Sequence, residues 1–308
     1  MNERLERRAR ERRARRRRRI VTVTLVVGAV AAGTVAVLRA PHARHAAAVA
    51  VRRHAPRVVH VHARVRFRPT RAYLTARVPI LMYHVIAAPP PGAPFPGLYV
   101  PAQEFAAQMD ALARAGFHGV TQNAVLRAWR GSGPLPRNPI VVTFDNGYRT
   151  QYTAALPVLR RLHWPAVENL QLAGLPPRQG GILPREVRAL LGAGWELDTQ
   201  GMSHADLPEL DARALARQIV VARNVIERRY HVRPRWFCYP SGRYDGTVIA
   251  AVRAAGFVGS TTVWPGWAAP TDDPYRLPRL RVLGGTSPPA LLAQIRAARF
   301  ALPAPASY

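Results

Sequence analysis

The pattern of hydrophobic and polar positions divides the chain at about residue 78. From there to residue 300, short runs of β-branched and aromatic residues alternate with segments whose apolar positions recur every three or four residues. Runs of the first kind are typical of buried strands, and segments of the second kind are typical of helices that pack on them. The pattern predicts strands over residues 79–84, 138–144, 165–170, 195–199, 235–239 and 258–262, and helices over residues 101–115, 148–162, 184–191, 212–230, 246–255 and 289–299.

This repetition of strand and helix predicts one α/β domain over residues 78–300, followed by a tail over residues 301–308. The strands should be parallel, because each is followed by a helix long enough to cross back over the sheet. A barrel and a doubly wound sheet both satisfy this pattern. In both folds the functional side chains lie at the C-terminal ends of the strands.

Before residue 78 the pattern changes completely. Residues 20–38 are uncharged and mostly Val or Ala, and as a helix they would be about 28 Å long, close to the thickness of a bilayer's hydrocarbon core. We expect a transmembrane signal anchor there, with an Arg-rich cytoplasmic arm over residues 1–19 and an extracytoplasmic domain. This predicts a single-pass protein of the cell membrane; a secreted protein, released by cleavage of the segment, is the alternative. Residues 39–77 contain Arg, His and Ala but no acidic residue, and we interpret them as a linker.

Charge adds little evidence for nucleic acid binding. All 45 basic residues are Arg, against 17 acidic residues, and the formal net charge is +28. Most of that charge precedes residue 78 and flanks the predicted membrane span, so we expect the arm to contact anionic membrane lipid. The single cysteine, Cys238, excludes an intrachain disulfide and a metal site built from several cysteines.

Polar side chains follow several of the predicted strands. His84 comes after the first, Asp145 and Asn146 follow the run ending at residue 144, and Gln200 and His204 follow the run ending at residue 199. Because the C-terminal ends of parallel strands meet at one edge of a sheet or one mouth of a barrel, we expect these side chains to converge.

In this order, five segments resemble motifs of the polysaccharide deacetylase (NodB-homology, carbohydrate esterase) family. They are VPILMYH, PIVVTFDNGY, ELDTQGMSHADL, FCYPSGRYD and RLPRLRV, and the first is similar to the branch that acts on poly-N-acetylglucosamine-type polymers. The resemblance implies a distorted (β/α)7-type barrel. It also implies a hydrolase that removes N-acetyl groups from amino-sugar polymers of the cell envelope, with a zinc-like divalent metal that activates water.

The resemblance also assigns roles to individual positions. Asp145 corresponds to the general base and His84 to the general acid, whereas Asn146, Gln200 and His204 occupy the three metal-ligand positions. The family has a carboxylate and two imidazoles there. Two of the three residues here are amides, which lack the negative charge or the imidazole nitrogen that zinc prefers, so we expect metal affinity to be greatly reduced.

Two interpretations of this change stay open. Glu168 and Asp198 are acids that could rebuild the site, although each could instead form an ion pair with a nearby Arg. Alternatively, the domain is a catalytically inactive glycan-binding pseudoenzyme. Under either interpretation, the candidate substrate-binding residues are Tyr239, Pro240, Ser241, Trp264 and Trp267.

Overall fold

The computed structural model describes residues 69–173, 175, 180–300, 302 and 304–308. The predicted arm, the predicted membrane span over residues 20–38 and most of the predicted linker lie outside these residues. Within the described ranges, no helix is both long enough and apolar enough to span a bilayer.

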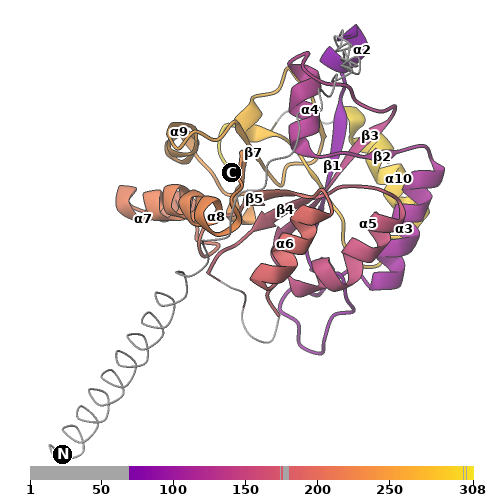
Figure 1. Cartoon of the computed structure of the whole chain (residues 1–308), viewed down its shortest axis with the longest axis horizontal. Coiled ribbons are helices and arrows are strands. Elements are labelled where there is room, and N and C mark those ends of the chain that lie inside the picture. The colour runs from indigo at the N-terminus through magenta and orange to yellow at the C-terminus, as the bar shows by residue number, and fades with distance from the viewer. Residues whose placement is uncertain (1–68, 174, 176–179, 301, 303) are drawn as a thin grey trace, which may run out of the picture. The chain divides into compact units, whose positions relative to one another are not determined.

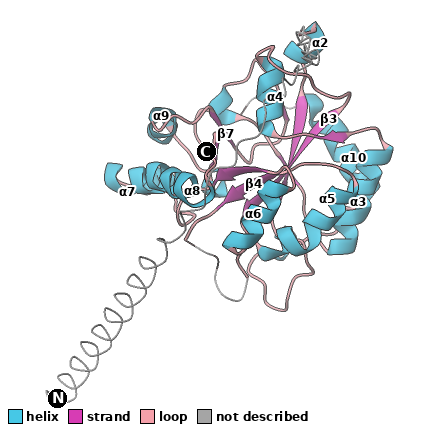
Figure 2. Ribbon diagram, viewed as in Figure 1, coloured by secondary structure: helices cyan, strands magenta, loops and turns pink. Residues whose placement is uncertain are grey.

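A curled sheet forms the centre of the domain (Figure 1, Figure 2). Six of its strands run parallel to one another in the spatial order β7-β6-β5-β4-β3-β1. They are β1 (Val78–Tyr83), β3 (Pro139–Asn146), β4 (Val167–Leu170), β5 (Glu196–Thr199), β6 (Trp236–Cys238) and β7 (Gly259–Thr261). Each lies within about two residues of a strand expected from the sequence, so the α/β prediction is confirmed.

Three short strands complete the sheet. β2 (His118–Gly119) pairs with β3, β8 (Trp267–Ala268) runs antiparallel to β1, and β9 (Leu280–Arg281) runs parallel to β1. Residues 277–281 connect the two ends of the sheet, because the amide of Leu277 donates to the carbonyl of Ser260 in β7 and Leu280 aligns with Leu81 in β1. The result is a curled half-barrel, consistent with the expected distorted (β/α) barrel.

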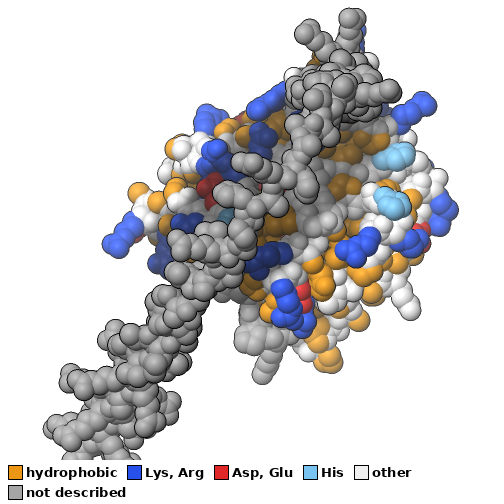
Figure 3. Space-filling view, in the orientation of Figure 1, with side chains coloured by type: hydrophobic (Ala, Val, Ile, Leu, Met, Phe, Trp, Pro, Cys, Tyr) orange, Lys and Arg blue, Asp and Glu red, His pale blue; other side chains and the backbone are white. Residues whose placement is uncertain are grey.

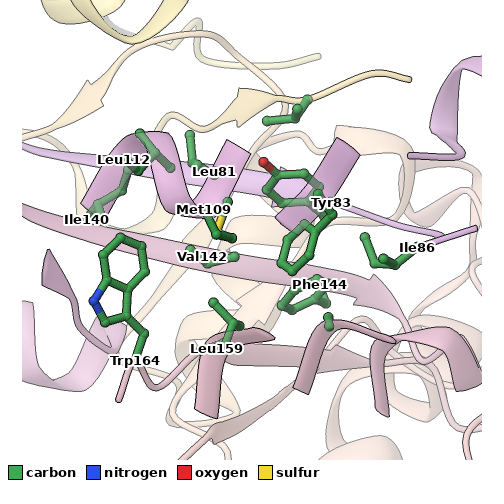
Figure 4. Close-up of a cluster of buried hydrophobic side chains, with 14 of the residues drawn as sticks. Leu81, Tyr83, Ile86, Met109, Leu112, Ile140, Val142, Phe144, Leu159 and Trp164 are labelled. Carbon is green, nitrogen blue, oxygen red and sulfur yellow. The ribbon is translucent and has the colours of Figure 1, made fainter. Parts of the chain in front are cut away.

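Helices cover the outside of this sheet. α3 (Ala102–Arg114), α5 (Leu156–Arg161), α6 (Pro184–Gly192) and α10 (Pro288–Ala297) enclose a core that contains Leu81, Tyr83, Val142 and Phe144 (Figure 4). α7 (Ala212–Ala216) and α9 (Gly246–Ala254) form a second core with the outer side of β6, and α8 (Ala222–Tyr230) packs in a further cluster with β4, β5 and α6. These helices keep the outer side chains of the strands away from water, which leaves the inner face and the strand ends for the site.

Two of the expected helices contain a π-helical stretch. Residues Gln151–Ala155 are π-helical before α5, and Arg217–Val221 join α7 to α8 in the same way. In the first case Pro157 lies in the first turn of α5 and has no amide hydrogen to donate, so the regular hydrogen-bond ladder cannot run through it. The predicted segments 148–162 and 212–230 are therefore helical, with a local widening.

In the described part of the chain, the longer of two helices that the sequence pattern did not predict is α4 (Gln122–Trp129). α4 places Val125 and Leu126 against the interior cluster at the N-terminal end of the barrel. Its first turn is capped by Thr121, whose side chain accepts from the amide of Ala124. An eight-residue helix contains too few turns for a clear apolar period, which explains the omission.

The folded unit also begins before residue 78. α2 (Arg71–Leu74) lies within the expected linker, and the indole of Trp129 in α4 donates to the carbonyl of Ala76 over 2.8 Å. At the other end, the backbones of Tyr244 and Tyr308 form a reciprocal pair of hydrogen bonds. Both segments therefore pack on the domain.

Candidate active site

A cavity of about 560 Å³ lies at the C-terminal ends of the parallel strands. Most of the residues expected from the sequence line it, namely His84, Asp145, Asn146, Gln200, His204, Tyr239 and Ser241. The convergence inferred from the strand ends is therefore observed.

Asp145 forms the floor of the cavity and is held from several sides. It is buried, and Arg279 donates to both of its carboxylate oxygens, over 2.7 Å from Nη1 to Oδ1 and 2.8 Å from Nη2 to Oδ2. Asn169 Nδ2 donates to Oδ1 over 2.8 Å, and the thiol of Cys238 lies 3.6 Å from Oδ2. These contacts fix the orientation of the carboxylate.

The electrostatic balance at Asp145 favours the charged form. Burial alone would raise its pKa, but the charge and hydrogen bonds of Arg279 outweigh that effect, with smaller contributions from His84 and Asn169. The pKa is lowered to about 2. Asp145 is therefore ionised at neutral pH, and its affinity for a proton is low.

His84 faces Asp145 across the floor, with Nε2 4.0 Å from Oδ2. Burial lowers the pKa of His84 to about 4, and the attraction of Asp145 is opposed by the charges of Arg279 and Arg281. The imidazole is therefore neutral at pH 7. Its Nδ1 atom has no hydrogen-bond partner among the described residues.

The three positions that correspond to metal ligands lie together, but their donors do not suit zinc. Asn146 adopts a left-handed backbone conformation (φ 77°), which turns the end of β3 into the cavity. The backbone amide of Asn146 donates a hydrogen bond over 3.0 Å to Oε1 of Gln200. The side-chain oxygen that Gln200 could offer to a metal is therefore already engaged. Burial lowers the pKa of His204, which leaves a single neutral imidazole.

The donor set thus consists of two neutral amides and one imidazole, and it does not fit a zinc-type ion. In addition, nowhere in the described part of the chain do three His, Cys, Asp or Glu side chains lie close enough together to hold a metal. We therefore derive no catalytic step that passes through a metal.

Glu168 and Asp198 do not replace the missing ligands. Glu168 is opposite Phe144 in the β3–β4 register, so it points toward the helices, away from the face that carries Asp145 and Asn169. Asp198 is on the inner face, but its Oδ1 accepts from the amides of Arg235 and Trp236 below the cavity. The expected ion pairs with Arg are also absent for these two acids within the described residues.

Burial is the main electrostatic influence on both acids. It raises the pKa of Glu168, whose oxygens have no hydrogen-bond partner among the described residues, and Asp145 raises it further. Burial also raises the pKa of Asp198, and the neighbouring carboxyl of Glu196 adds to that effect. Both acids therefore favour the neutral form.

Among the expected substrate-binding residues, only Tyr239 and Ser241 line the cavity. Pro240 is buried beside them, and the indole of Trp264 donates to the carbonyl of Leu302 outside the cavity. Trp267 lies in β8 next to Pro79, at the opposite end of the barrel, and its indole donates to Ile295. Trp267 therefore does not line the cavity, and its hydrogen bond to Ile295 helps to anchor α10.

The fold also brings to the site residues that the sequence pattern did not predict there. Arg279 is entirely buried against Asp145, and two exposed aromatic rings, Phe95 and Tyr308, lie on the rim of the cavity. The alternation in RLPRLRV, which places Arg279 and Arg281 on one side of a strand, was the available signal for Arg279. No local pattern marks Phe95 or Tyr308.

Comparison with known proteins agrees with this geometry. Residues 132–260 match the sequence profile of the polysaccharide deacetylase family. The Bacillus subtilis (strain 168) protein YxkH, itself assigned to the polysaccharide deacetylases, is 26% identical over 221 residues, which cover 71% of this chain and 76% of that protein. Over these residues the chain is therefore similar to polysaccharide deacetylases. Its relatives group it with hydrolases of carbon–nitrogen bonds.

Two further relatives of the deacetylase domain are informative. The deacetylase PplD of Streptococcus pyogenes, solved in complex with acetate, superposes with a TM-score of 0.66 at 22% identity and covers 72% of this chain and 99% of its own, so it supports the fold. The poly-β-1,6-N-acetyl-D-glucosamine N-deacetylase of Escherichia coli (strain K12) is 42% identical over 52 residues, which make up 17% of this chain and 8% of that enzyme.

Proposed function

We propose that the domain binds N-acetylated amino-sugar polymers of the cell envelope in the cavity above Asp145 and hydrolyses their N-acetyl groups. The observation that carries this proposal is the pairing of Asp145 with His84, 4.0 Å apart, at the floor of a cavity at the strand ends. The short match to an enzyme named for poly-β-1,6-N-acetyl-D-glucosamine deacetylation supports the choice of polymer.

In this scheme Asp145 takes a proton from the attacking water, and the small protonated fraction of His84 gives its proton to the departing amine. The proton on Asp145 then passes to His84, whose Nε2 lies 4.0 Å from Oδ2, and both groups are ready for the next cycle. Water adds to the acetyl carbonyl carbon, the carbon–nitrogen bond breaks, and the products are acetate and a free amino sugar. The pKa values of Asp145 and His84, about 2 and about 4, are far below neutrality. Both groups are poorly matched to proton transfer at pH 7, so we expect slow turnover.

The test is acetate release from N-acetylglucosamine oligomers by the full chain. We expect slow release that Asp145→Asn abolishes, with circular dichroism to verify that the variant is folded. Asp110→Asn is the matched control, because Asp110 lies on α3, pairs with Arg161 of α5 and does not line the cavity. A complete lack of acetate release from every acetylated oligomer offered, with or without added divalent metal, would contradict hydrolysis.

The amides at Asn146 and Gln200 favour a second candidate, a glycan-binding pseudoenzyme. Such a protein binds N-acetylglucosamine polymer without releasing acetate, and a chelator does not weaken the binding. Chelator-sensitive binding would count against this alternative.

We also propose that residues 20–38 anchor the protein in the cell membrane, with residues 1–19 on anionic lipid in the cytoplasm and the domain outside. The uncharged run and the Arg-rich segment before it support this topology. Protease added to intact cells should then degrade the domain and spare the arm; protection of the domain would contradict the topology.

A further inference from the structure

β9 and the residue before it direct two arginines toward the inside of the barrel. Arg279 and Arg281 are on one side of the strand, and Leu280 between them packs into the core under the helices. The side chain of Arg279 contacts Asp145. Arg281 lies two residues closer to the C-terminal end of the strand, and its side chain lines the cavity. The backbone at Arg281 is fixed, because its carbonyl accepts from Gln294 Nε2 and it aligns with Met82 in β1.

The charges of these two arginines are compensated differently. Arg279 forms a bidentate ion pair with Asp145, which has the only side-chain carboxylate among the described residues that line the cavity. Arg281 is exposed, and across the described residues no carboxylate lies within ion-pair distance of it. Arg281 therefore brings to the mouth of the cavity a positive charge that no described carboxylate pairs with.

This charge acts on the floor of the site. Arg281 is one of the groups that lower the pKa of His84, after burial and Arg279, so its field reaches the centre of the cavity. A neutral polymer offers nothing to balance such a charge, whereas an anionic substituent on a sugar ring would. Guanidinium binds carboxylate and phosphate groups through two parallel hydrogen bonds, with a specificity that an ammonium group lacks.

We propose that Arg281 is a specificity-determining residue that binds an anionic substituent of the glycan. The preferred ligand is then an acidic polymer of N-acetylated amino sugars, bearing carboxylate or phosphate groups. This inference rests on the proposed glycan function and narrows it from amino-sugar polymers in general to acidic ones.

The test compares ligands that differ only in charge. Dissociation constants of the full chain are measured for a hexasaccharide of alternating N-acetylglucosamine and glucuronic acid and for its methyl ester. A second pair, an N-acetylglucosamine hexasaccharide with and without 6-phosphate groups, distinguishes phosphate from carboxylate. We expect the acidic member of at least one pair to bind about tenfold more tightly, and the difference to shrink as salt is added.

Arg281→Gln should reduce that preference to within about twofold, because the amide keeps hydrogen-bonding capacity but loses the charge. The matched control is Arg296→Gln, because Arg296 is an exposed arginine on α10 that does not line the cavity. This variant should keep the full preference for the acidic ligand. Thermal melting verifies that both variants are folded.

If the acidic and neutral members of both pairs bind equally, Arg281 does not select acidic ligands and this inference is wrong. The proposed glycan function is not affected by that result. A preference that persists in Arg281→Gln would overturn the inference as well. Binding of none of the four oligosaccharides would instead overturn the proposed function itself, so the two failures can be told apart.

Discussion

At the scale of single residues, the central feature is a carboxylate stabilised inside the barrel by one arginine. Removing Asp145 from water is costly, and the bidentate contact with Arg279 compensates for that cost only while both partners are present. Arg279 Nη1 also donates to Thr143, and its Nε donates to the carbonyl of Thr262. The pair therefore ties β3 to the segment that closes the barrel.

We predict that Arg279→Met lowers the free energy of unfolding by about 4 kcal/mol, because it leaves a buried carboxylate without its counter-ion. Asp145→Leu should be similarly destabilising, whereas the double variant should recover more than half of the loss. Urea denaturation of the three variants measures this coupling. Strictly additive losses would show that the two side chains do not depend on each other.

At the scale of elements, the rim of the cavity is built by two segments far apart in the sequence. Phe95 precedes a 3-10 turn, Pro96–Leu98, in the connection after β1, and 68% of its surface is exposed. Tyr308 is 53% exposed, its backbone pairs with Tyr244, and its ring meets the edge of Trp264. Exposed aromatic rings beside a cavity are suited to stacking on the apolar faces of sugar rings.

We predict that Phe95→Ala and Tyr308→Ala each weaken binding of N-acetylglucosamine hexasaccharide about fivefold, which corresponds to the loss of about 1 kcal/mol of stacking. Phe300→Ala is the matched control, since Phe300 is 81% exposed but does not line the cavity. Isothermal titration calorimetry provides the affinities. If the control weakened binding as much as the rim variants, stacking at the rim would not be the cause.

At the scale of the whole molecule, the high arginine content does not translate into one basic patch on the face of the described domain that Figure 3 shows. On the face seen in Figure 3, arginine side chains are spread among hydrophobic and neutral ones rather than gathered in one patch. The chemistry depends instead on a few positions in the cavity, and above all on Asn146 and Gln200, where the family has metal ligands. The type of donor atom at these two positions distinguishes a metal-binding site from a site that binds glycan without a metal.

We predict that the purified protein contains much less than one zinc ion per chain. Asn146→Asp combined with Gln200→His should bring zinc close to one per chain, because it supplies a carboxylate and a second imidazole beside His204. Elemental analysis after dialysis against zinc measures both proteins. Stoichiometric zinc in the unaltered protein, retained in an Asn146→Ala variant, would show that other residues hold the metal.

Local sequence was sufficient to locate most elements and half of the site. The strand that ends at Asn146 and the helices of the outer layer follow from periodicity, and Asp145, His84 and His204 follow from their positions after strands. These predictions succeed because burial repeats along a strand or helix with a short, regular period. Trp267 was misplaced because its aromatic character does not indicate which end of the barrel it faces.

Only the tertiary structure showed which residues contact each side chain of the site. Arg279 is 134 residues from Asp145 in sequence, and only the curling of the sheet brings it to the carboxylate. Three other features also depend on which residues pack together in space. The side-chain oxygen of Gln200 accepts from the backbone amide of Asn146, Glu168 points outward, and the charge of Arg281 has no carboxylate partner in the described part of the chain. Contacts between distant segments depend on how strands close in space, and no local period encodes that closure.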